Sequence, residues 1–168
     1  NQLDTALKSY EKALAIKPDF AEVHYNLGIT LQGLGQLDAA VKHYEQALER
    51  FDEVLDRVDD HLEALIKKGD SLRLLGRFRE AASSLEHAAR LAPDNLGALY
   101  SLTDTYEELK AVGKAQHILQ RIIEIGPETT VSAHRKLRDM FAGQGKWDEA
   151  DEIQEKILRM VSCEEEQV

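Results

Sequence analysis

The chain has 168 residues, of which 43% are apolar and 31% are charged, and its formal net charge at pH 7 is −10. This composition is typical of a folded domain of ordinary size and excludes a disordered chain. The acidic balance argues against nucleic acid as a ligand, because phosphate binding requires a basic face.

The first predicted helix covers residues 3–16, where apolar residues return at the three- and four-residue spacing of one helix face. Pro18 follows it closely and marks its end. A second helix is predicted from Ala21 to about Leu34, and Gly35 suits the turn that ends it.

The next predicted helix is unusually long. From Leu37 onward, apolar residues keep helical spacing as far as Val58, and no proline interrupts them. We therefore predict one helix from Leu37 to about Asp59; a helix that breaks near Asp52 is the alternative. Seven extra residues add about two turns and return the apolar stripe to nearly the same face.

Three further helix pairs follow. The first of them keeps the repeat pattern, and the other two depart from it. The pair in residues 62–95 is regular and has glycines in both expected places. In residues 96–130, Lys110 stands where the turn glycine is expected, which predicts a turn of different shape. In the same pair, Thr103 replaces the glycine that the earlier first helices have at 28 and 69. In residues 131–162, Arg138 stands at this small-residue position, which predicts a looser contact between the helices or the edge of the array.

Small residues mark the period of these pairs. A fixed period near 34 with helical spacing inside it indicates a solenoid of stacked helix pairs, which share a continuous core because no pair can stand alone. One interval is longer by seven residues, at the long helix. The equivalent alanines are 34, 41, 34 and 35 residues apart: Ala6, Ala40, Ala81, Ala115 and Ala150.

Three motifs carry a resemblance to a known family: N-L-G at 26–28, G-x-L-D-A-A at 35–40 and Y-x-x-A-L at 44–48. Together with the prolines that close most units, they resemble the tetratricopeptide repeat (TPR) family. The resemblance implies an all-α, right-handed superhelical solenoid of antiparallel helix pairs. It comprises about four full repeats and an N-terminal half-repeat, with one helix lengthened by the seven-residue insertion.

The predicted solenoid is a single domain over residues 1–162, followed by an acidic tail at 163–168. Its parts are a half-repeat at 1–20 and repeats at 21–61, 62–95, 96–130 and 131–162. The family implies a protein-interaction scaffold without chemistry of its own. We therefore expect a chain that is not an enzyme.

By resemblance to the family, the first helices of the pairs line the concave face. A few apolar and aromatic anchors in an otherwise acidic groove suit an extended or helical peptide that carries Lys or Arg. The alternative is that these positions are solvated and only keep the array soluble. Helical spacing projected onto this face selects Tyr25, Ile29, Gln32, Ile66, Asp70, Arg73, Tyr100, Asp104, Glu107, Arg135 and Asp139.

The first helix lacks a partner helix before it, which leaves Leu3, Leu7 and Tyr10 with less cover. An apolar strip at the end of an array favours association. A homodimer through this half-repeat, and with it a structural or self-assembly role, is therefore the second interpretation. A third is the repeat region of a larger bacterial transferase or envelope-assembly protein.

Other chemistry finds little support in the sequence. The six histidines form no HExxH motif, and no phosphate-binding loop or nucleophile motif is present, so we expect no cofactor, no metal and no catalytic residue. The single cysteine, Cys163, excludes an internal disulfide, and no apolar run is long enough for membrane insertion. These features are compatible with a cytoplasmic location. Nothing in the sequence names the partner.

Overall fold

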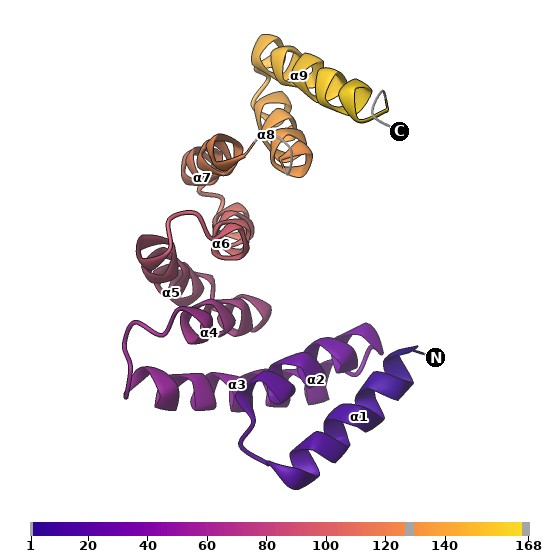
Figure 1. Ribbon diagram of the computed structural model, residues 1–168, viewed down its shortest axis with the longest axis vertical. Coiled ribbons are helices and arrows are strands. Elements are labelled where there is room, and N and C mark those ends of the chain that lie inside the picture. Colours follow the sequence, from indigo (N-terminus) through magenta and orange to yellow (C-terminus); the bar gives the residue numbers. More distant parts are fainter. Residues whose placement is uncertain (1, 127–129, 166–168) are drawn as a thin grey trace. The chain divides into compact units, whose positions relative to one another are not determined.

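The computed structural model describes residues 2–126 and 130–165, with side chains as far as residue 162, and every element in these ranges is an α-helix (Figure 1). The predicted all-α fold is confirmed. In chain order the helices are α1 (Gln2–Ile16), α2 (Ala21–Gly33), α3 (Leu37–Leu55), α4 (Leu62–Leu74), α5 (Phe78–Leu91), α6 (Leu96–Glu108), α7 (Val112–Ile125), α8 (Val131–Gly143) and α9 (Trp147–Glu165).

These helices form two compact units, which we call unit 1 (Asn1–Pro93) and unit 2 (Asp94–Val168). In unit 1, α2 packs against α3 and α4 against α5, while α1 packs against α2. In unit 2, α6 packs against α7 and α8 against α9. The helix pairs predicted from the repeat are therefore present in both units.

Tight turns join the two helices of each pair, and each turn has one residue with a positive φ. Three of these residues are glycines, Gly35, Gly76 and Gly145, with φ between 73° and 76°. The fourth is Lys110, with φ of 55°. Its backbone N–H donates to the carbonyl of Glu107 at 2.9 Å, as in the glycine turns. The predicted difference in turn shape is therefore wrong, because these hydrogen bonds hold a lysine in the left-handed region.

The long helix α3 has 19 residues, whereas α5 has 14. It ends at Leu55, four residues earlier than predicted, so the insertion adds little more than one turn. Acidic residues at 56, 59 and 60 explain the early end, since carboxylates are unfavourable near the negative end of a helix dipole. Val58, which extended the apolar pattern, is 53% exposed and has no core position to fill.

The last helix runs past the predicted boundary of the acidic tail. α9 continues to Glu165, so the first half of the segment 163–168 is helical. Residues 166–168 lie outside the described residues. The boundary predicted at residue 163 therefore falls within α9.

In unit 1, the close contact between the two helices of each pair requires a glycine in the first helix. A Cβ on Gly28 would lie 2.5 Å from Cε1 of Tyr44, and a Cβ on Gly69 would lie 2.5 Å from Cγ of Leu85. No side chain fits at such distances, so the aromatic or aliphatic residue of the second helix packs directly on the backbone of the first. This contact sets the position of α2 and α4, which carry the predicted binding residues of unit 1.

Helix α1 is less covered than its equivalents, and none of its residues is buried. Tyr10 is half-buried, whereas Tyr44, at the same repeat position in α3, is 2% exposed. Leu3 and Leu7 are also half-buried; a Cβ on Gly33 would lie 3.4 Å from Leu3 Cδ1. The predicted association residues thus keep part of their apolar surface in contact with unit 1 and part in solvent.

Candidate peptide-binding surface

In unit 1, the predicted binding residues come from α2 and α4, the first helices of two neighbouring pairs. The ring of Tyr25 lies 6.3 Å from the ring of Tyr44, at an interplanar angle of 52°. The hydroxyl of Tyr44 donates to Oε1 of Gln32 at 2.7 Å. Nζ of Lys67 lies 4.8 Å from the centroid of the Tyr25 ring, within the range of a cation–π interaction. These contacts connect side chains of α2, α3 and α4.

Two predicted contact residues of unit 1, Tyr25 and Asp70, are buried, each with 8% of its surface exposed. Burial, followed by the negative charge of Asp70, raises the pKa of Tyr25 to about 12, while the positive charge of Arg73 opposes this rise. The tyrosine hydroxyl therefore stays protonated at neutral pH. Both residues support the surface from beneath and offer little area to a ligand.

The accessible part of this surface consists of neighbouring apolar and polar side chains. Ile29 is 44% exposed, Gln32 is exposed, and Ile66, Lys67 and Arg73 are half-buried. We call these five residues the unit 1 patch. Two apolar side chains beside two cations and an amide can contact both the side chains and the backbone of a peptide.

In unit 2, the predicted residues of α6 meet a lysine of α8. Nζ of Lys136 lies 2.6 Å from Asp104 Oδ1 and 3.1 Å from Glu107 Oε2. Burial alone lowers the pKa of Lys136, but its hydrogen bonds and ion pairs with the two carboxylates outweigh that effect and raise it. The lysine is therefore charged, and two predicted acidic contacts already share one cation.

The remaining predicted residues of unit 2 also have charged neighbours. Arg135 and Asp139 are exposed, and Tyr100 is half-buried. Arg138 donates from Nε and Nη2 to Oδ1 of Asp139, at 2.8 and 2.6 Å. The acidity predicted for this face is therefore reduced by ion pairs. Between α6 and α8, one net negative charge remains among Asp104, Glu107 and Lys136.

The selection from sequence omitted two lysines that lie on these surfaces, Lys67 and Lys136. Each directly follows a selected residue, Ile66 or Arg135, and both occupy the repeat position of Asn26. A projection of helical spacing places them at the edge of the face. Their long side chains reach inward across it, which a projection of Cα positions misses. The shared repeat position is the signal that could have found them.

The described part of the chain contains neither a candidate metal site nor a candidate membrane-spanning helix. No group of three or more His, Cys, Asp and Glu side chains there is placed to hold a metal ion. None of the helices described combines the length and the apolar character that a bilayer span requires.

Sequence profiles of one known family match most of the chain. Three tetratricopeptide-repeat profiles match residues 1–35, 19–94 and 72–140. Together they extend over residues 1–140. The chain belongs to the tetratricopeptide repeat family, as its motifs indicated.

Several solved structures share this fold. A MamA fragment from Desulfovibrio magneticus RS-1 is 24% identical, with a TM-score of 0.69 over 97% of this chain and 88% of that chain. A thermophilic TPR protein of Thermus thermophilus is 24% identical, with a TM-score of 0.66 over 94% and 82%. YrrB, described as a TPR protein with an unusual peptide-binding site, is 19% identical, with a TM-score of 0.64 over 95% and 78%. At these identities the likeness establishes the fold.

Proposed function

We propose that the chain is a non-enzymatic scaffold that binds a peptide or protein segment in the concave groove lined by its first helices. The observation that carries the proposal is the unit 1 patch. Ile29 keeps 44% of its surface exposed one helical turn after Tyr25, whose ring is contacted by Lys67 of α4. An apolar anchor with polar neighbours is the pattern that peptide-binding helical grooves use. Family membership supports this role, because TPR proteins are typically interaction scaffolds without catalytic activity.

A basic residue of the ligand is the finer part of the proposal, and we assign it to unit 2. There Asp104 and Glu107 share only Lys136, so one negative charge remains to attract a cation. In unit 1, Asp70 is buried while Lys67 and Arg73 are more accessible. The unit 1 patch would therefore contact apolar and backbone atoms of a peptide.

Selection from a phage-displayed library of random peptides tests the proposed groove. The blocking variant is Ile29→Arg, which replaces an exposed apolar side chain of the unit 1 patch by a bulky charge. The matched control is Val41→Arg on α3, since Val41 is 42% exposed and comes from a second helix. We expect selected peptides to lose at least about tenfold in affinity for Ile29→Arg, the equivalent of 1.4 kcal/mol. Equal binding to both variants, or no selected peptide at all, would contradict the proposal.

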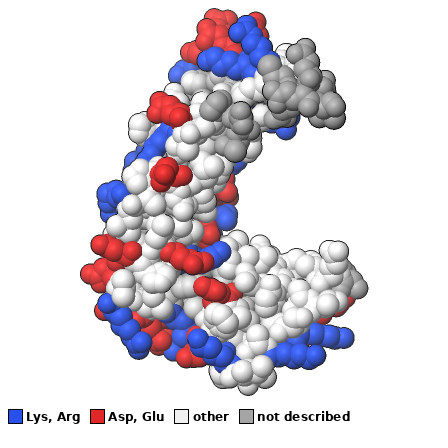
Figure 2. Space-filling view, in the orientation of Figure 1, with Lys and Arg blue, Asp and Glu red and all other residues white. Residues whose placement is uncertain are grey.

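Self-association through α1 is a second candidate role, favoured by a specific observation. Tyr10 of α1 is half-buried although the equivalent Tyr44 is almost completely buried. In the view of Figure 2, most of the surface over α1 and α2 is uncharged, and Lys and Arg gather along its lower edge. Covering such an apolar face is favourable in proportion to the area removed from water. We therefore propose a second copy of the chain as the occupant of this face.

A further inference from the structure

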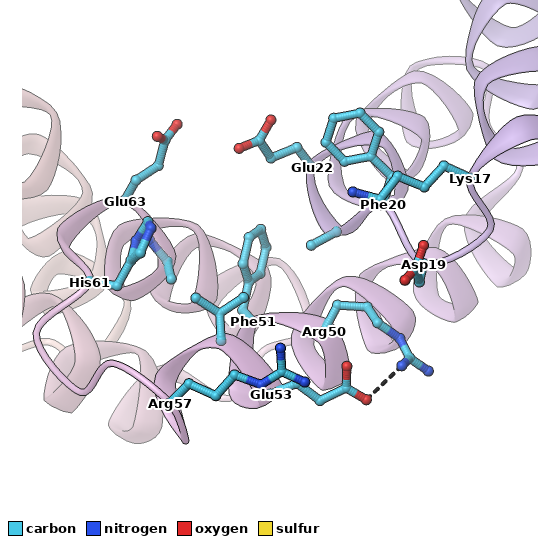
Figure 3. Close-up of a pocket in the computed structure, with 13 residues that line it drawn as sticks. Lys17, Asp19, Phe20, Glu22, Arg50, Phe51, Glu53, Arg57, His61 and Glu63 are labelled. Carbon is cyan, nitrogen blue, oxygen red and sulfur yellow. Dashed lines mark hydrogen bonds and ion pairs between the residues drawn. The ribbon is translucent and has the colours of Figure 1, made fainter.

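Unit 1 contains a pocket that shares no lining residue with the unit 1 patch. The residues before and at the start of α2 form one wall, the last turns of α3 form the floor, and the start of α4 forms the other wall (Figure 3). Its volume is about 360 Å³. This is near the lower end of the range for ligand pockets, and it offers room for one or two side chains.

The floor of the pocket belongs to the extra length of α3. Leu91, the last residue of α5, has the same repeat position as Arg50 in α3. Phe51, Val54 and Arg57, which line the pocket, therefore lie beyond the point at which a helix of ordinary length ends. The seven-residue insertion thus creates a surface that a regular pair of this array lacks.

The floor and one corner of the pocket are apolar. Phe51 is buried in the core of unit 1 with its ring at the base of the pocket, and Val54 is half-buried beside it. Phe20, at the entrance, is 37% exposed. A bulky apolar side chain placed here would cover surface of Val54 and Phe20 that now meets water, which is favourable.

The pocket is lined by charges of both signs, with four carboxylates (Asp19, Glu22, Glu53 and Glu63) and three cations (Lys17, Arg50 and Arg57). Figure 3 shows the carboxylates of Glu22 and Glu63 on one side of Phe51, and Arg50 and Arg57 on the other. Arg50 is already held by Glu53 at 2.6 Å. In the part of the chain that the structure describes, Glu22 and Glu63 have no hydrogen bond or ion pair through their side chains, so both can accept from a cation.

We infer that this pocket binds a segment of a partner protein in which a bulky apolar residue stands next to Lys or Arg. The apolar residue lies on Val54 and Phe51, and the neighbouring cation lies between Glu22 and Glu63. Charge complementarity favours a basic segment over an acidic one. Outside the Arg50–Glu53 pair, three lining carboxylates (Asp19, Glu22 and Glu63) outnumber two lining cations (Lys17 and Arg57). The site is additional to the concave groove and does not depend on it.

Two variants and one matched control test this inference by the same phage-display selection. Val54→Phe fills the pocket without a change of charge. Glu22→Gln with Glu63→Gln removes both rim charges, and Glu45→Gln with Glu108→Gln makes the same change in net charge at two exposed positions outside the pocket. Circular dichroism melts of each variant verify the fold. Binding is measured with synthetic copies of the selected peptides.

We expect one class of selected peptides to contain a bulky apolar residue next to Lys or Arg. This class should lose affinity for Val54→Phe and lose roughly three- to tenfold for the Glu22/Glu63 double variant, but bind the Glu45/Glu108 control and Ile29→Arg normally. Peptides that are sensitive only to Ile29→Arg would support the groove and overturn the pocket. Absence of the predicted class, or equal binding to the two double variants, also overturns the pocket.

A second copy of the chain is another possible occupant of this pocket, and tryptophan fluorescence can detect it. Lys146 precedes Trp147, which is 64% exposed and is the single tryptophan of the sequence. A shift of its fluorescence to shorter wavelength with rising concentration, absent from Val54→Phe, would identify a second copy as the occupant. That result would overturn the proposed partner segment. An emission independent of concentration supports it.

Discussion

Arg138 of α8 donates a hydrogen bond from Nη1 to Oε1 of Gln154 in α9, at 2.5 Å. In unit 1 the same two repeat positions hold Gly69 and Leu85, where the glycine leaves no room for a side chain. The last pair has thus exchanged a close backbone contact for a contact between two polar side chains. The interface that the sequence predicts to be loose at Arg138 is held by a specific hydrogen bond.

This exchange predicts energetic coupling between the two positions. Arg138→Met and Gln154→Leu should each lower the free energy of unfolding by about 0.5–1.5 kcal/mol, because each leaves the other polar group without its partner. The double variant should lose less than the sum, with a coupling of at least about 0.5 kcal/mol. Urea denaturation of the four proteins measures it. Strictly additive losses would show that the hydrogen bond contributes nothing.

The turn at Lys110 predicts a stabilising substitution. A lysine with φ of 55° carries a steric cost in the left-handed region that glycine avoids. Part of that gain is offset by the greater freedom of glycine in the unfolded chain. Lys110→Gly should therefore raise the free energy of unfolding by about 0.5–1 kcal/mol, and the reverse change, Gly145→Lys, should lower it. A destabilised Lys110→Gly variant would rule out strain at this turn.

The histidine pair of unit 1 predicts a dependence of stability on pH. Nε2 of His24 lies 2.7 Å from the carbonyl of Pro18 and donates to it, so Nδ1 of neutral His24 accepts from Nδ1 of His43 at 3.0 Å. Burial, followed by the charge of His24, lowers the pKa of His43, although Glu11 opposes this shift. If both rings were positively charged, the Nδ1–H groups of His24 and His43 would face each other.

The lowered pKa of His43 determines the direction in which stability changes with pH. The unfolded chain takes up a proton at His43 near pH 6.5, before the folded chain does, so the free energy of unfolding should fall as pH drops below about 6.5. Above that pH the contribution is constant. His43→Phe keeps a ring on His24 but cannot titrate, so its stability should vary less between pH 8 and 5. The same pH profile in both proteins would exclude the pair as the cause.

The stretch from Phe51 to Val58 begins with a residue of the core and ends with an exposed one. Phe51 is buried in the main apolar cluster of unit 1, whereas Val58, beyond the end of the helix, is 53% exposed. Phe51→Ala should cost about 3–5 kcal/mol of unfolding free energy through lost burial and a cavity. Val58→Ala should stay within about 0.5 kcal/mol of the parent. Thermal melts of both variants measure the contrast.

The deletion of residues 51–57 should consequently unfold α3 and α4, because it removes Phe51 from the core. A deletion variant with normal stability would show that the extra turn is dispensable.

The α1 face predicts association that depends on concentration. Sedimentation equilibrium of the unmodified chain should detect a dimer, and Leu3→Lys with Leu7→Lys should return it to a monomer with its other helices intact. Val41→Lys is the control, since Val41 has the repeat position of Leu7 in α3 and is exposed. A parent chain that stays monomeric at high concentration would exclude this role.

The helix pairs could be predicted from the sequence because their causes are local and repeat. The positions of Gly28, Ala40 and Tyr44 recur at intervals near 34 residues, with one interval of 41. In unit 1 the glycine position and the Tyr44 position mark a close contact between the two helices of a pair. A spacing of 3.6 residues and a period near 34 need no knowledge of distant residues. The fold class and the family follow from them directly.

Other features depend on side chains that only the tertiary structure brings together. Lys136 meets Asp104 and Glu107 across two helices, so no local pattern reveals that the predicted acidic contacts are paired. Hydrogen bonds to the preceding helix hold the backbone of Lys110 in the left-handed region that glycine usually occupies. The pocket beside Phe51 exists because the extended α3 lies between the starts of α2 and α4. Helical spacing determines which residues share a face, whereas charge pairing and cavities are set by what the opposite helix places there.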